Sequence, residues 1–142
     1  MNAAAVRAVL LLGVLYAAVG VLFGLRAGQA ASAEMSIAWR RAASVVSAIA
    51  FGAHIVYDQV RLHGSLTLTA LRVSSAAGLG AFGLAVAANI HAQSVPPDQR
   101  PPNLLLSLAL WPVITAVPAF MVALVSAMLL DRVRRGAARR VD

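Results

Sequence analysis

The side chains best placed to do chemistry lie close together in the sequence, at His54, Asp58 and Arg61. Their spacing of four and then three residues puts all three on one stripe of a helix. An imidazole beside a carboxylate and a guanidinium can hold a charge that responds to pH in the physiological range. Two interpretations stay open. The group is either a functional polar site at membrane depth, or an interfacial ion pair of Asp58 and Arg61 worth under about 1 kcal/mol.

A second group of polar side chains lies at the end of the apolar stretch 73–90. The start of the stretch 42–57 should lie at a similar depth in the membrane. The candidate residues of this outer polar rim are Arg40, Arg41, Asn89 and His91, with Glu34 and Gln93 beside them. Such a cluster can bind an anion or a lipid headgroup, or it can be a solvated rim. The residue types alone do not separate these two interpretations.

The sequence predicts no metal site, no b-type haem and no catalytic residue. There is no cysteine, and only three histidines are available as ligands. A haem needs two axial ligands at one depth, whereas His54 and His91 are expected near opposite membrane faces and His63 lies outside the apolar stretches. The chain also contains no H-E-x-x-H motif, no nucleophile elbow and no close carboxylate pair.

Four apolar stretches must position these side chains: residues 8–25, 42–57, 73–90 and 104–130. About 20 apolar residues cross the roughly 30 Å hydrocarbon core of a bilayer as a helix. The composition agrees, because 61% of the residues are hydrophobic and 12% are charged, whereas soluble domains have about a quarter charged residues. The sequence therefore predicts an all-α, polytopic membrane protein with four transmembrane helices in a single up-down bundle.

The predicted spans are about 5–26, 37–60, 71–92 and 103–131, followed by a basic C-terminal tail at 132–142. The first span has an alternative, since Ala31-Ser32-Ala33 resembles a signal-peptidase site and residues 1–33 could be a cleaved signal peptide. A retained helix is favoured because its apolar core is long and Arg26 follows it as an interfacial stop.

The third and fourth stretches carry packing signals. The third is dense in Gly, Ala and Ser, so we expect it to be the most buried helix. Its G-x-G-x-x-G string, Gly78 to Gly83, lies inside an apolar helix and not after a strand, so packing explains it better than dinucleotide binding. In the fourth stretch Pro112 and Pro118 predict a kink, either static or a functional hinge. The proline-rich connector at 96–102 is expected to be rigid.

All twelve basic residues are arginines, and the net charge is +7. They flank apolar stretches and have no aromatic stacking platform between them, which favours interfacial anchors over nucleic-acid binding. Alternating spans put eight arginines on the side of the two termini and four on the other. Both termini are therefore predicted to be cytoplasmic, in a multi-pass protein of the cell membrane. The C-terminal arginines are expected to contact anionic lipid headgroups.

These patterns predict a small, non-catalytic integral membrane protein, a bundle or accessory subunit whose partner is another membrane protein or a second copy. The alternative is a proton- or ion-linked small-solute transporter or channel subunit that uses the stripe of His54, Asp58 and Arg61. In size the chain is similar to the small multidrug-resistance exporters. Those proteins rely on a glutamate in the first helix, and the first predicted helix here has no carboxylate.

Overall fold

The computed structural model describes residues 3–96, 98, 100 and 103–138, so several prolines of the 96–102 connector and the end of the tail, with Arg139 and Arg140, lie outside the described part. The described residues form four α-helices: α1 (Ala3–Gly28), α2 (Ala33–Arg61), α3 (Leu66–Gln93) and α4 (Leu104–Ala138). All four are long and apolar enough to cross a membrane. The predicted all-α bundle of four transmembrane helices is thus confirmed.

Local sequence explains where the helices begin. The Ser32 hydroxyl caps α2 by accepting a hydrogen bond from the Met35 amide at 3.2 Å, and Ser65 caps α3 in the same way. A serine at this position satisfies an amide that the helix itself leaves unpaired. Both α2 and α3 begin a few residues before the predicted spans, because the serine caps and not the apolar stretches determine where these helices start.

The fourth helix runs as one continuous helix through both internal prolines and past the apolar stretch into the predicted tail. At about 1.5 Å per residue its 35 residues are about 52 Å long, more than the hydrocarbon core requires. An i,i+4 ion pair, Arg135 to Asp131 at 2.7 Å, supports the extension. The first part of the basic tail is therefore helical.

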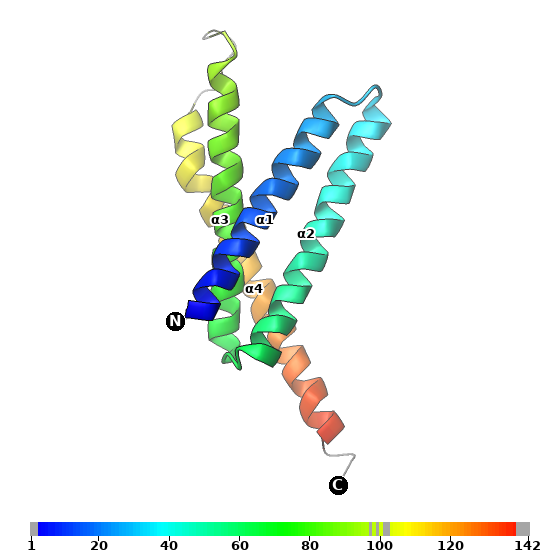
Figure 1. The fold of residues 1–142 in the computed structure, drawn as a ribbon, viewed down its shortest axis with the longest axis vertical. Helices are drawn as coiled ribbons and strands as arrows, with labels where there is room; N and C mark the ends of the chain where they lie inside the picture. The colour runs from blue at the N-terminus through cyan, green and yellow to red at the C-terminus, as the bar shows by residue number, and fades with distance from the viewer. Residues whose placement is uncertain (1–2, 97, 99, 101–102, 139–142) are drawn as a thin grey trace.

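The four helices alternate in direction, and the α1–α2 hairpin leans away from the α3–α4 hairpin (Figure 1). We call the end with the α2–α3 connection the closed end, and the end with the α1–α2 and α3–α4 connections the open end. Within α2 the buried residues are His54, Ile55, Asp58 and Gln59, all in its last two turns. The second helix therefore meets α3 and α4 at the closed end, whereas it packs more extensively on α1, with Trp39 against Phe23 near the open end.

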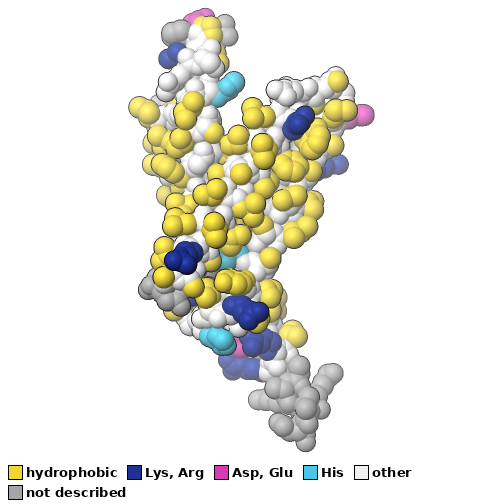
Figure 2. Space-filling model, viewed as in Figure 1, with side chains coloured by type: hydrophobic (Ala, Val, Ile, Leu, Met, Phe, Trp, Pro, Cys, Tyr) yellow, Lys and Arg dark blue, Asp and Glu magenta, His cyan; other side chains and the backbone are white. Residues whose placement is uncertain are grey.

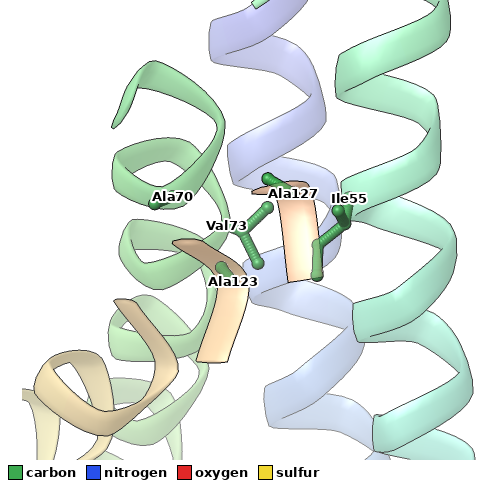
Figure 3. Packing of buried hydrophobic residues seen from close by; sticks show 5 residues of the cluster. All are labelled: Ile55, Ala70, Val73, Ala123 and Ala127. Atoms are coloured by element: carbon green, nitrogen blue, oxygen red, sulfur yellow. The ribbon is translucent and has the colours of Figure 1, made fainter. Parts of the chain in front are cut away.

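One cluster of buried apolar side chains also lies towards the closed end. Ile55 of α2 meets Val73 of α3 and Ala123 and Ala127 of α4 there (Figure 3). Most other apolar side chains point outwards, so that the surface between the charged ends is largely hydrophobic (Figure 2). This distribution is typical of helices whose outer faces contact lipid.

The third helix lies at the centre and has the largest buried share of the four, as its small residues predict. It packs mainly against α4 and α1. A Cβ at Gly80 would overlap the Cβ of Tyr16, and one at Gly83 would lie 2.7 Å from the Cβ of Ala17. The glycines of the G-x-G-x-x-G string are therefore points where α1 and α4 approach α3 closely.

Candidate functional site

A buried group of polar side chains, here called the polar cluster, lies at the closed end and consists of His54, Asp58, Thr69 and Arg72. Asp58 is fully buried. Its Oδ1 accepts a hydrogen bond from Arg72 Nη1 at 3.0 Å, and its Oδ2 accepts one from Thr69 Oγ1 at 2.7 Å. Thr69 and Arg72 are three residues apart on α3 and so face α2 together. A buried ion pair thus joins α2 to α3.

The structure brings the predicted stripe of His54, Asp58 and Arg61 together only in part. His54 and Asp58 share the buried face of α2, but Arg61 is exposed at the last residue of the helix. The ion pair of Asp58 is made with Arg72 and not with Arg61. In the predicted orientation Arg72 counts only as one of the eight arginines on the side of the termini. Its position seven residues after the Ser65 cap, inside α3, is the signal that could have identified it, because a charge within a membrane helix needs a partner.

The α2–α3 connection covers the polar cluster. His63 adopts a left-handed backbone with φ of 48°, which turns the chain back towards α3. Gly64 then passes so close that an added Cβ would collide with Asp58 Oδ2 and lie 2.9 Å from Thr69 Oγ1. Only glycine therefore lets the connection close over the ion pair without displacing it.

His54 is the one member of the polar cluster without a hydrogen bond. It is 1% exposed, and neither ring nitrogen has a hydrogen-bond partner among the described residues. Arg72 Nε is buried and unpaired as well. Leaving a buried polar group unpaired costs about 1–3 kcal/mol. Apolar packing alone gives no reason to keep an imidazole at this position.

A cleft of about 760 Å³ begins roughly one helical turn from His54 and extends towards the open end. Tyr16 and Gly20 of α1 line it together with residues of α3, while α2 and α4 contribute the other lining residues. Small side chains dominate, among them Ala43 and Ala48 of α2 and Ala81 of α3. The cleft exists because α2 and α4, which touch near the closed end, do not close over α1 and α3 further along.

Hydroxyl groups supply most of the polarity of the cleft. Ser44 and Ser47 lie on its α2 side, Thr115 on its α4 side and Tyr16 on α1. The Tyr16 hydroxyl is buried and has no hydrogen-bond partner among the described residues. No described residue of the lining carries a carboxylate, imidazole or guanidinium. The cleft therefore suits an uncharged, mainly apolar occupant that can exchange a few hydrogen bonds.

The predicted outer polar rim is dispersed. Arg40, Arg41 and His91 are exposed, and the open end of α2 stands apart from that of α3 (Figure 1). Asn89 is half-buried, and its Nδ2 donates to the Leu104 carbonyl and the Ser107 hydroxyl, both at 3.1 Å. Asn89 thus ties α3 to the start of α4, a structural contact that the sequence did not indicate.

The chemistry open to these residues is limited. Nowhere in the described part of the chain do three histidine, aspartate or glutamate side chains gather as a metal site would require. His54 is at the closed end and His91 is exposed on the last turn of α3, so they do not face one another across one haem. The polar cluster can exchange a proton, and the cleft can bind by apolar contact and hydrogen bonding.

Comparison with known proteins assigns no family. The sequence matches no protein-family model, no curated protein and no solved structure. Its function must therefore be argued from its own residues.

Proposed function

We propose that the chain is a non-catalytic subunit of a membrane complex, and that a transmembrane helix of another membrane protein occupies the cleft. The cleft itself is the observation that carries this proposal. It separates α2 from α4 over the faces of α1 and α3, within helices long and apolar enough to cross a membrane. A protein with these spans is embedded in the bilayer, so whatever fills the cleft comes from the membrane.

The lining favours a helix over lipid tails. Small residues let helix backbones approach closely, and van der Waals packing of this kind drives helix association in membranes. The hydroxyls of Tyr16, Ser47 and Thr115 find no hydrogen-bond partner in a hydrocarbon chain. A helix offers serine, threonine or asparagine side chains to them. The unpaired Tyr16 hydroxyl is thus accounted for if a partner helix supplies an acceptor.

The dimensions support the same occupant. Along α3 the lining runs from Ala77 to Ala88, which is about 16 Å of helix, and along α2 from Ala43 to Phe51, about 12 Å. This length matches two to three turns of a partner helix. Only part of a membrane-spanning helix would be enclosed, with the rest exposed to lipid or to its own protein.

Site-specific photocrosslinking in native membranes tests the proposal. A photoreactive residue replaces Ser47 or Thr115 in the cleft, and matched controls replace Ile49 or Val113, which lie two residues away on the same helices and are well exposed. We expect both cleft positions, and neither control, to crosslink to the same transmembrane segment of one protein, located by mass spectrometry. Crosslinks to lipid alone, or equal yields at all four positions, would refute the proposal. Crosslinks to another copy of this chain would show that the helix in the cleft comes from a second copy and not from a different protein.

The polar cluster supports a second candidate function, a proton- or ion-linked transporter or channel subunit. Ionisable groups at membrane depth are expensive and commonly mark ion or substrate pathways. Asp58 and Arg72 are such groups, and they lie between the cleft and the closed end without lining the cleft. Proton flux into liposomes containing the purified protein tests this function. Asp58→Asn should abolish a flux that the exposed-carboxylate control Glu34→Gln retains. Absence of protein-dependent flux in the parent would exclude the transport function.

The arginine distribution supports a cytoplasmic location for both termini. Because Arg72 is buried in an ion pair, it is no longer counted as a loop charge, which leaves seven arginines on the side of the termini against four. A cytoplasm-dependent fluorescent reporter after α4 should be active, and a reporter that works only outside the cytoplasm should be active at Asp98. The reverse pattern would overturn the orientation. Contact between the C-terminal arginines and anionic headgroups stays a prediction.

A further inference from the structure

We propose that His54 is a binding site for a single proton, and that occupancy of this site loosens the attachment of α2 and widens the cleft. This goes beyond the proposed function, because it holds whichever molecule fills the cleft. It rests on three features of the closed end: the position of His54, its unpaired nitrogens and the small buried face of α2.

The attachment of α2 to α3 and α4 is short and mostly polar. Of its four buried residues, only Ile55 is apolar. Asp58 is held by Arg72 and Thr69 of α3, and Gln59 Nε2 donates to the Ala127 carbonyl of α4 at 3.4 Å. Towards the open end α2 lines the cleft without a buried residue. The charges at the closed end therefore determine how firmly α2 is held against α3 and α4, while its more extensive packing is against α1.

His54 can accept a proton at either ring nitrogen, since both are buried and unpaired. The charged groups that act on it are Asp58, one turn away on α2, and Arg72 from α3. The part of α4 packed nearby supplies Ala123 and Ala127, which do not ionise. On α1, Arg7 is exposed, and on the α2–α3 connection His63 is exposed.

With His54 neutral, the charges of Asp58 and Arg72 compensate one another. A proton on His54 leaves a net positive charge in a buried site. The imidazolium repels Arg72 and competes with it for the carboxylate of Asp58. A buried charge without its own partner is costly, so protonation favours a state in which α2 moves outwards and water reaches the polar cluster. By linkage, the open state then binds the proton more tightly than the closed state does.

Spin-label distances measured in nanodiscs test the movement. Because the chain has no cysteine, labels attach only at introduced sites. The pair Ile37→Cys and Leu105→Cys places exposed labels on the open ends of α2 and α4, and the control pair Ile90→Cys and Leu105→Cys spans α3 and α4. We expect the α2–α4 distance to be longer at about pH 5 than at about pH 8, and the α3–α4 distance to be constant.

Histidine variants identify the responsible group. In His54→Gln the α2–α4 distance should be the same at both pH values, whereas His63→Gln and His91→Gln should behave like the parent. A parent distance that does not change with pH overturns the proposal, as does a pH-dependent distance that persists in His54→Gln.

A second measurement keeps the proposal testable if His54→Gln does not fold. In the double variant His63→Gln/His91→Gln, His54 is the only histidine. Its ¹⁵N-labelled ring should show one titration between about pH 4 and pH 9 by NMR. A ring spectrum that stays constant over this range excludes proton binding at His54, even if the distances change.

Discussion

The two ends of this bundle are built from the same four helices but are packed in opposite ways. At the closed end α2 meets α3 and α4, the polar side chains of Asp58 and Arg72 pair, and a glycine lets the connecting loop cover them. Further towards the open end, hydroxyls of α1, α2 and α4 line a cleft, and Tyr16 keeps an unpaired hydroxyl. In a membrane, apolar surface alone does not draw helices together, because lipid is equally apolar. Helices pack closely where polar groups or small residues match, and α2 is matched to α3 and α4 at the closed end only.

The closed end should be the more sensitive to a single substitution. Asp58→Leu or Arg72→Leu leaves an unpaired buried charge, and each should lower the free energy of unfolding in detergent by about 3–5 kcal/mol. The double variant removes both charges and should recover much of that loss. Unfolding titrations of the parent, both single variants and the double variant measure the coupling. Additive losses in the double variant would show that the pair does not hold α2.

The next largest effects are expected for substitutions at the contacts between α1 and α3. Gly80→Leu would place a side chain against Tyr16, and Gly83→Leu would place one against Ala17. Each should destabilise the bundle by about 1–3 kcal/mol through overpacking. The matched control is Gly52→Leu on α2, where an added Cβ meets nothing within 4 Å. If the α3 variants melt like the Gly52 variant, α1 does not pack on α3 as described.

The open end should respond to loss of its unpaired hydroxyl in a different way. Tyr16→Phe removes a buried group that has no hydrogen-bond partner among the described residues, so the melting temperature in detergent should stay the same or rise slightly. The same variant should reduce the crosslinking yield at Ser47 in native membranes, because a partner helix loses a hydrogen bond. A clear fall in melting temperature would indicate that the hydroxyl is already satisfied within the chain.

The smallest effect is expected for Arg61, the residue that the helical spacing placed beside Asp58. Because Arg61 is exposed and Asp58 pairs with Arg72, Arg61→Gln should change the free energy of unfolding by less than about 0.5 kcal/mol. Comparison with Arg72→Leu in the same assay distinguishes the contributions of the two arginines to the free energy of unfolding. If Arg61→Gln lowers the free energy of unfolding as much as Arg72→Leu does, Arg61 is the partner of Asp58, as the helical spacing suggested.

The sequence by itself determined the helices and part of the polar cluster. Helix number and approximate spans follow from local rules, since a bilayer demands about 20 apolar residues per crossing and leaves the backbone no other hydrogen-bond partner. The periodicity of a helix also placed His54 and Asp58 on one face of α2, and the small residues of α3 indicated its central position.

Only the tertiary structure decided which helix faces meet. The sequences of α1, α3 and α4 are apolar around nearly their whole circumference, so no amphipathic stripe marks a buried side. The pairing of Asp58 with Arg72, fourteen positions away, depends on the turn at His63 and on Gly64. The unpaired state of His54, the link from Asn89 to α4 and the cleft depend on the positions of neighbouring helices. These positions are set by how side chains fit between helices, which the pattern of any single helix does not contain.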